Sequence, residues 1–106
     1  FGGRYSHAIR KGPLLAPNAD STSALFAPEQ IVAREPGSDE RALAEQVLKA
    51  LPFSDPLLYA RVDLLRGEDG APVLLELELT EPSLFFAYAD GSVERYLDTL
   101  QAMLAA

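Results

Sequence analysis

Alternation of apolar and polar residues predicts a β-hairpin in the second half of the chain. Apolar and polar residues alternate, as they do in half-buried strands, in the runs LLYARVDLL (57–65) and PVLLELELT (72–80). The connector RGEDGA contains Asp69-Gly70, a strong signal for a two-residue hairpin turn. We therefore expect an antiparallel pair that turns at Asp69-Gly70.

This turn sets which residues share a face of the hairpin. It places Asp63 opposite Glu76 and Arg61 opposite Glu78, all on one face with Tyr59. The other face receives the apolar residues Ala60, Val62, Leu64, Leu75, Leu77 and Leu79. A three- or five-residue loop would instead put Asp63 and the glutamates on opposite faces and leave one strand's apolar set in water.

Apolar residues at helical spacing predict two helices. The first follows Ser38, a plausible N-cap with acids at 39 and 40, and it ends before Pro52. The second runs from about Ser92 to Leu104. The stripes expected to form the core are Leu43, Ala44, Val47, Leu48 and Leu51 on the first helix and Val93, Tyr96, Leu97, Leu100 and Leu104 on the second.

The N-terminal part predicts a shorter set of elements. Gly2-Gly3 has the form of a hairpin turn, and the alternating segment 4–11 that follows predicts a strand. A strand before that turn is missing, so we expect a fragment of a longer protein. Residues 13–28 predict a long loop and residues 30–34 a short extended segment. The whole, 1–106, is expected to be a single α+β domain with an antiparallel sheet and two packing helices.

Composition narrows the function classes. The 106 residues are 48% hydrophobic, enough for a core, and carry a net charge of −7, which argues against nucleic acid or an anionic membrane as partner. The chain has no cysteine, so disulfides and thiolate metal sites are excluded. It has no apolar run of about 20 residues and no visible signal peptide, and we expect a cytoplasmic protein.

The facing acids allow two readings. Like charges opposite one another destabilise a sheet by up to about 1 kcal/mol, and a solvated face with Arg61 as partial relief can tolerate that. Clustered carboxylates on rigid strands also suit Mg²⁺. His7, the single histidine, is expected to be a hydrogen-bonded structural residue, and Leu84, Phe85 and Phe86 are expected to lie in the core.

The segment ARVDLLRGEDGAPVLLELELTEPS resembles the closing hairpin of the ATP-grasp superfamily, to which D-alanine–D-alanine ligase and glutathione synthetase belong. In that family a strand with Arg-x-Asp precedes a strand with Glu-x-Asn and then a proline. Arg61-Val62-Asp63 matches the first motif, and Glu76-Leu77-Glu78 matches the second, with Glu78 where Asn is usual; Pro82 follows. SHAIRKGP (6–13) is similar to an earlier strand of the family that presents basic side chains.

The resemblance implies the C-terminal subdomain of a ligase that activates a carboxylate as an acyl phosphate with ATP as co-substrate and joins it to an amine or similar nucleophile. It implies Asp63, Glu76 and Glu78 as ligands of Mg²⁺ (or Mn²⁺), Arg61 as the catalytic residue, and Arg10 and Lys11 as contacts of phosphate or an acidic substrate. The family's glycine-rich loop and N-terminal nucleotide-binding lysines are absent, so the fragment alone is expected to catalyse nothing. A homodimer remains open.

Two other functions stay open. An acid on one strand and Glu-x-Lys on the next also forms the Mg²⁺ hairpin of some nucleases, but Glu78 and the negative net charge speak against it. The acidic face can also belong to a non-catalytic interaction domain, where it serves only solubility.

Overall fold

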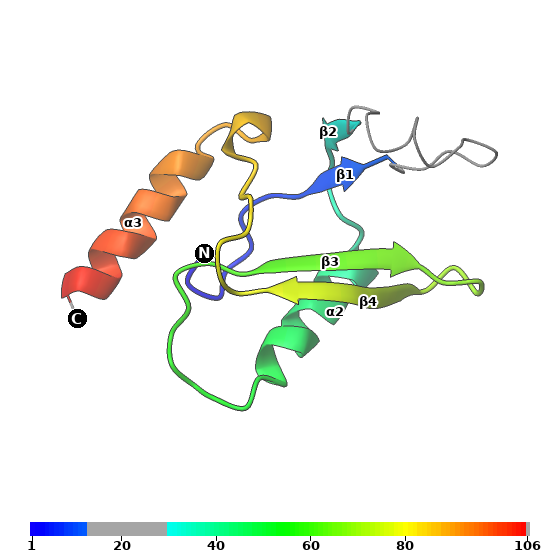
Figure 1. Ribbon diagram of the computed structural model, residues 1–106, viewed down its shortest axis with the longest axis horizontal. Helices are drawn as coiled ribbons and strands as arrows, with labels where there is room; N and C mark the ends of the chain where they lie inside the picture. Colours follow the sequence, from blue (N-terminus) through cyan, green and yellow to red (C-terminus); the bar gives the residue numbers. More distant parts are fainter. Residues whose placement is uncertain (13–29, 106) are drawn as a thin grey trace.

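The computed structural model describes residues 1–12 and 30–105 and shows an α+β fold. Its helices and strands, in chain order, are β1 (Ile9–Lys11), β2 (Ile31–Ala33), α2 (Ser38–Lys49), β3 (Arg61–Arg66), β4 (Pro72–Glu78), the 3₁₀ helix η1 (Phe86–Tyr88) and α3 (Ser92–Ala105) (Figure 1). Within the described residues the strands form two antiparallel pairs, β1–β2 and β3–β4, rather than one sheet. The long loop predicted for 13–28 lies outside the described residues.

The first predicted turn is present, but the strand after it is shorter than predicted. Phe1 and Arg4 exchange backbone hydrogen bonds of 2.9 and 3.1 Å across Gly2 and Gly3, which both have positive φ. The strand begins only at Ile9, whereas alternation predicted it from Arg4. The partner strand β2 has only three residues, and one further backbone hydrogen bond, from the Arg34 N–H to the Ala8 carbonyl at 3.2 Å, follows the paired segment.

Helix α2 begins one residue earlier than its predicted cap implied. Gly37, not Ser38, is the N-cap, because the Glu40 carboxylate reaches back to accept the Gly37 N–H at 2.7 Å. The acids predicted for the first turn are there, and the helix ends at Lys49, before Pro52.

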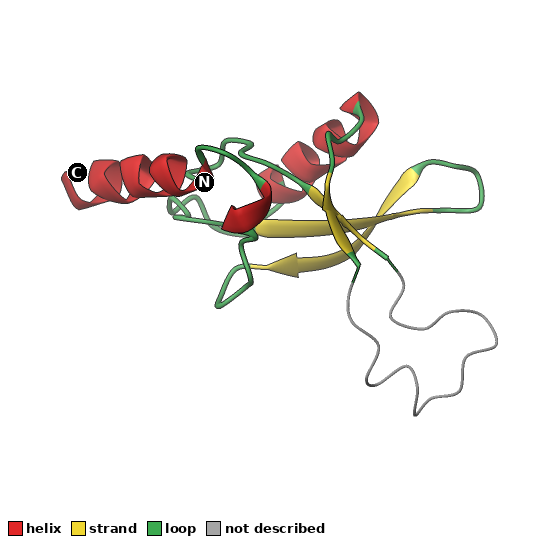
Figure 2. Ribbon diagram, turned by 90° about the horizontal axis from the view of Figure 1, so that it is seen from above, coloured by secondary structure: helices red, strands yellow, loops and turns green. Residues whose placement is uncertain are grey.

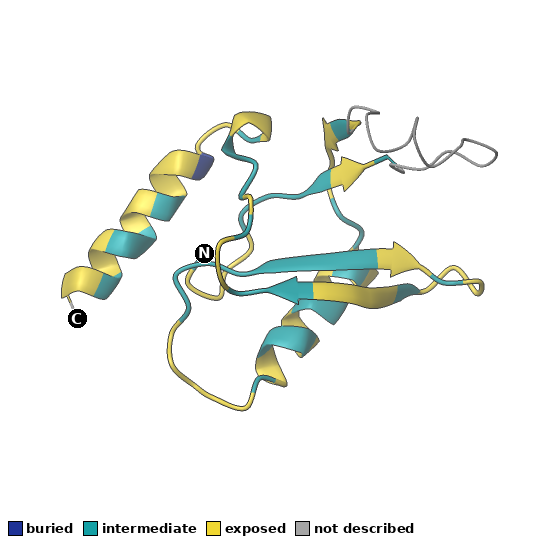
Figure 3. Ribbon diagram, viewed as in Figure 1, coloured by how far each residue is buried: buried dark blue, intermediate teal, exposed yellow. Residues whose placement is uncertain are grey.

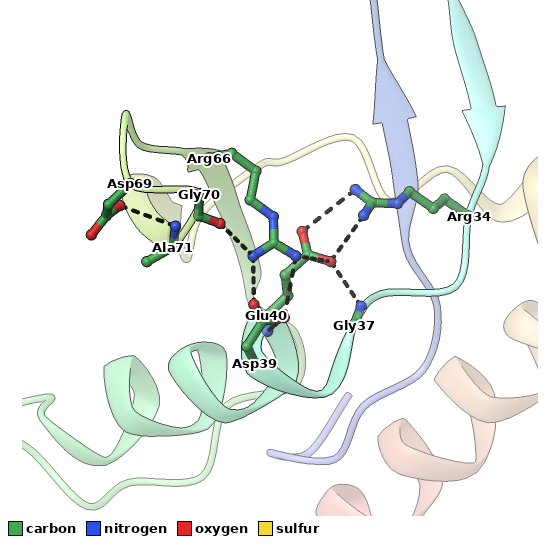
Figure 4. A network of polar contacts seen from close by, with 8 residues as sticks. All are labelled: Arg34, Gly37, Asp39, Glu40, Arg66, Asp69, Gly70 and Ala71. Atoms are coloured by element: carbon green, nitrogen blue, oxygen red, sulfur yellow. Dashed lines mark hydrogen bonds and ion pairs between the residues drawn. The ribbon is translucent and has the colours of Figure 1, made fainter.

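A polar network fixes the start of α2 against the hairpin (Figure 4). The Arg66 guanidinium, at the end of β3, bonds both oxygens of Asp39 and lies 3.5 Å from Glu40. Arg34, just after β2, pairs with the same Glu40 at 3.1 Å. The hydrogen bond from Arg66 is the main reason that the pKa of Asp39 is lowered. The network thus ties β2, α2 and the hairpin to one another, and α2 packs on β4 (Figure 1).

The hairpin turn differs from the predicted one. Gly67 and Ala71 close the turn through a 2.8 Å hydrogen bond, so three residues, 68–70, form the loop. Gly70 has φ +81°, and the Asp69 carboxylate accepts the Ala71 N–H at 3.0 Å. This is the favoured geometry of a three-residue loop with glycine in the left-handed position. The predicted two-residue turn is therefore wrong.

A β-bulge compensates for this turn. Near the loop Leu64 pairs with Leu74, whereas Asp63 pairs with Glu76, so Leu75 is an extra residue on β4. Beyond the bulge the register is the predicted one, with Arg61 opposite Glu78. Without the extra residue, the three-residue loop would send the glutamates to the face opposite Asp63. Leu75, predicted in the core, is 60% exposed.

The apolar side chains do not close into a core within the described residues. None of them is fully buried there, and Ser92 is the one residue with no exposed surface (Figure 3). The radius of gyration is 15.7 Å, against roughly 13 Å for a compact domain of this length. Figure 2 shows α3 and the hairpin extending away from each other. The fold is correspondingly elongated, 52 × 30 × 23 Å.

Helix α3 shows this most clearly. Phe1 and Phe86 make edge contacts with Tyr96, at ring centroid distances of 5.5 and 5.6 Å. The stripe residues Val93, Leu97 and Leu104 are exposed instead of buried, so their predicted place in the core is wrong for the described structure. Within the described residues these rings cover only one side of the helix. None of the helices in the described residues is long and apolar enough to cross a membrane.

Candidate metal centre

Three carboxylates converge on one face of the hairpin. Asp63 comes from β3, and Glu76 and Glu78 come from β4. One oxygen from each side chain lies within 4.8 Å of the other two. The predicted convergence is therefore confirmed, although the role of these residues as metal ligands stays a prediction.

Arg61 lies inside this cluster. Its Nε and Nη2 donate to the two oxygens of Asp63, both at 3.0 Å, and Nη2 also donates to Glu78 at 3.0 Å. The Arg61 side chain is only 18% exposed. Burial lowers the pKa of Arg61, but the hydrogen bond and charge of Asp63 and the two glutamates outweigh it, so the pKa is raised. Arg61 is a permanent cation held between two carboxylates.

Glu76 is the exposed member of the cluster. A hydrogen bond with Glu78, the charge of Glu78 and the charge of Asp63 raise the pKa of Glu76, and Arg61 offsets this only in part. Arg61 directs its hydrogen bonds to Asp63 and Glu78, and its charge is the smallest of the influences on the pKa of Glu76. It is the carboxylate with the most to gain from an additional cation.

The donor set suits a small divalent cation. Hard oxygen ligands at this spacing match Mg²⁺, which takes one or two carboxylates directly and fills its other positions with water or phosphate oxygens. Each carboxylate oxygen has two lone pairs, so the hydrogen bonds from Arg61 leave acceptor positions on Asp63 and Glu78. The residues present therefore fit such an ion.

The two basic residues of β1 do not share one position. Lys11 Nζ lies 5.2 Å from the centre of the Phe85 ring, and Arg61 Cζ lies 5.5 Å from the same centre. Arg10 is exposed, and strand alternation directs it away from the side that Lys11 occupies. The structure thus brings Lys11 to the aromatic ring that Arg61 also contacts, whereas strand alternation directs Arg10 away from it.

The loop after β4 holds an unusual backbone. Glu81 and Phe85 both have φ +54°, a conformation that costs a residue other than glycine roughly 1–2 kcal/mol. The loop is held from two sides: Tyr59 Oη accepts the Glu81 N–H at 3.3 Å, and Arg61 Nη1 donates to the Ser83 carbonyl at 3.3 Å. Strain of this kind persists only where the surroundings determine the conformation, and it clusters at functional sites.

His7 holds the same loop from the N-terminal side. Its Nε2 lies 2.7 Å from the Leu84 carbonyl, which can only accept, so Nε2 carries the proton. Ser6 Oγ then donates to Nδ1 at 2.7 Å and accepts from Arg95 Nε at 2.9 Å. The expected hydrogen bonding of His7 is confirmed.

Sequence reasoning missed Phe85. The sequence predicts core positions for Leu84, Phe85 and Phe86 alike, and all three residues are half-buried. Phe86 does join the aromatic contacts beside α3. Phe85 instead faces two cations, and no local pattern distinguishes it from its neighbour.

The chain is similar in sequence and in structure to a known protein. No protein-family model matches the chain. The chain is 41% identical over 108 residues to the cycloserine biosynthesis protein DcsG of Streptomyces lavendulae, an alignment that covers 98% of this chain and 36% of that protein. The crystal structure of D-cycloserine synthetase DcsG matches with a TM-score of 0.81 and 38% identity, over 98% of this chain and 36% of that one.

The likeness has a definite extent. The chain spans about a third of the length of the relatives it matches (36%), so the similarity is to one part of those proteins. Over that part the α+β fold is shared, and the acidic hairpin lies inside it.

Proposed function

We propose that this chain is the metal- and phosphate-binding part of an ATP-grasp ligase, which activates a small carboxylate as an acyl phosphate and joins it to an amine-type nucleophile. The observation that carries the proposal is the convergence of Asp63, Glu76 and Glu78 around Arg61. The similarity to D-cycloserine synthetase supports a biosynthetic ligase over a solvated acidic face.

The carboxylates have one task in this proposal. Asp63, Glu76 and Glu78 would hold Mg²⁺ (or Mn²⁺), which supplies charge compensation to the ATP phosphates during transfer. Glu76 must be ionised to bind, so its raised pKa makes metal binding favour neutral over acidic pH.

Arg61 has the other task. Its planar guanidinium is fixed by Asp63 and by the Ser83 carbonyl, and it would donate to the transferring phosphoryl group or to the oxyanion of the intermediate. A donor that is already oriented needs little rearrangement when charge develops beside it. Lys11 lies against the same Phe85 ring as Arg61 and would contribute a second positive charge.

The test uses the intact protein with ATP, Mg²⁺ and a panel of small amino-acid carboxylates, and it measures ADP. We expect ADP only when Mg²⁺ and an accepted carboxylate are both present. Asp63→Asn should lower turnover by several powers of ten while the fold is retained. Asp69→Asn, in the hairpin turn and away from the cluster, is the matched control and should keep its turnover.

Direct cation binding separates the alternatives. Calorimetric titration with Mn²⁺ should show binding that Asp63→Asn loses and Asp69→Asn keeps. If Asp63→Asn retains both Mn²⁺ binding and turnover, the acidic face is only solvated and the proposal is wrong.

A further inference from the structure

We propose that Phe85 is a positioning residue whose ring seats Lys11 and Arg61 together, so that both cations meet the same anionic group beside the acidic cluster. This inference rests on the proposed function, and it assigns a role to an aromatic residue with no polar atom of its own. The anionic group is a phosphate or acyl-phosphate oxygen, the chemistry that the two cations and the neighbouring carboxylates would share.

The ring is where three distant segments meet. Lys11 belongs to β1, Arg61 to β3, and Phe85 to the loop after β4. Both positive groups lie within 5.5 Å of the ring centre, inside the range of favourable cation–π attraction. Two like charges repel, and the attraction of each cation to the electron-rich ring offsets part of that repulsion. The ring therefore stabilises an arrangement that the cations alone would disfavour.

The Phe85 ring has a fixed position because hydrogen bonds hold the backbone next to it. Phe85 is in the left-handed conformation, with φ 54° and ψ 41°. His7 fixes the carbonyl of residue 84, and Arg61 itself fixes the carbonyl of residue 83. Arg61 is thus held to this loop twice, through the Ser83 carbonyl and through the Phe85 ring.

Arg61 connects the Phe85 ring to the candidate metal centre. Arg61 bonds Asp63 and Glu78 with the same guanidinium that lies over the ring. A shift of the ring would therefore move a donor that the carboxylates also orient. A phosphate oxygen bound between the metal ligands and Arg61 would have Lys11 as its second cation.

The kinetic test compares two aromatic residues in the intact protein. Phe85→Leu keeps a large apolar side chain of similar backbone preference but removes the ring, and we expect kcat/KM for ATP to fall roughly tenfold or more. Phe85→Tyr restores a ring and should recover most of that loss. Phe86→Leu removes the neighbouring ring, which contacts Phe1 and Tyr96 and neither cation, and should change kcat/KM less than twofold.

A double-mutant cycle separates positioning from a structural role. If Phe85 acts through Arg61, then Phe85→Leu should cost much less in an Arg61→Lys background than in the native one. If the two losses multiply independently, or if Phe85→Leu leaves kcat/KM unchanged, the inference is overturned.

A spectroscopic readout makes the inference independent of the ligase reaction. In the intact protein, with arginine labelled by ¹⁵N, the Nε–H proton of Arg61 should move when Phe85→Leu removes the ring current, and should stay in place with Phe86→Leu. If the protein forms no ADP from ATP but this shift is observed, the proposed function is refuted while the positioning role of Phe85 stands. If Phe85→Leu leaves the Arg61 signal in place, the positioning role of Phe85 is refuted, whatever the activity.

Discussion

Replacing Arg61 with methionine should loosen the hairpin by an amount that depends on pH. Methionine keeps the approximate length and the apolar stem but removes all the donors. Three contacts of 3.0 Å to carboxylates and one of 3.3 Å to the Ser83 carbonyl would be lost. The change leaves Asp63 and Glu78, each 26% exposed, close together without the cation that bonds both of them.

The magnitude lies between two known limits. Exposed ion pairs contribute about 0–1 kcal/mol, and removing one partner of a fully buried pair costs about 3–5 kcal/mol. Arg61 is 18% exposed and its partners are 26% exposed, so the site lies between these limits. We expect a loss of about 2–3 kcal/mol in the local stability of the hairpin at pH 7, roughly a 30- to 150-fold change in the equilibrium for opening.

Native-state hydrogen exchange is the suitable assay, because it reports opening of β3 and β4 separately from unfolding of other parts. The amides to follow are those of Asp63 and Glu78, because the Gly67 N–H bonds the Ala71 carbonyl and alternation along the strands then turns these two amides toward the partner strand. Arg10→Met, which removes an exposed arginine from β1, is the control for a change in net charge and should leave these amides unaffected.

The pH dependence is what decides the reasoning. Acid neutralises carboxylates in general, and neutral carboxyl groups neither repel one another nor attract a guanidinium, so the loss caused by Arg61→Met should shrink at low pH. Added Mg²⁺ should recover part of the loss at pH 7, because a cation then replaces the missing charge. A loss that is equally large at pH 3.5 and pH 7 would show that Arg61 contributes packing alone.

Two further predictions concern single positions in the same hairpin. The pKa of Glu76 is raised in the folded state, so its proton contributes stability in full below the ordinary pKa of 4.5. This contribution is lost as the pH rises through the raised pKa. In the absence of metal, Glu76→Gln should therefore be more stable than the native protein at pH 7 and as stable as it near pH 3, as measured by thermal melting at both pH values. Gly70→Ala should cost about 1 kcal/mol of hairpin stability by hydrogen exchange and Gly70→Asn clearly less, because the position needs φ +81° while no atom lies within 4 Å of an added Cβ; equal losses would point to a side-chain clash instead of backbone strain.

The sequence predicted the acidic face correctly although it predicted the turn wrongly. Alternation showed which residues of each strand share a face, and this holds for Asp63, Glu76 and Glu78. The three-residue loop and the extra residue Leu75 each shift the register by one, in opposite directions, so the pairing at the acids matches the simpler expectation. Neither shift has a signal in the alternation itself, because bulges depend on how the whole ladder fits together.

Other features depend on contacts that no local pattern contains. The apolar stripe of α3 is present, but periodicity says nothing about whether another segment covers Leu97 or Leu104. The role of Phe85 depends on Lys11 and Arg61, which reach it from two other segments. Helix boundaries were predictable to within one or two residues because caps and prolines act locally.

The extra residue on β4, Leu75, separates the loop end of the hairpin from the end that carries the acids. The loop end can therefore change in length while the acids stay paired. Leu75 divides the ladder into a part next to the loop and a part that carries Asp63 and Glu76, and the two parts follow different registers. A hairpin that closed one residue differently at its loop would pair Leu75 directly with Leu64, lose the bulge, and leave the acid pairing as it is. Deletion of Leu75 would likewise bring Leu74 and Glu76 together in a regular ladder with the same partners. The loop end can therefore diverge, or be exchanged for another turn, while the acidic end keeps its arrangement.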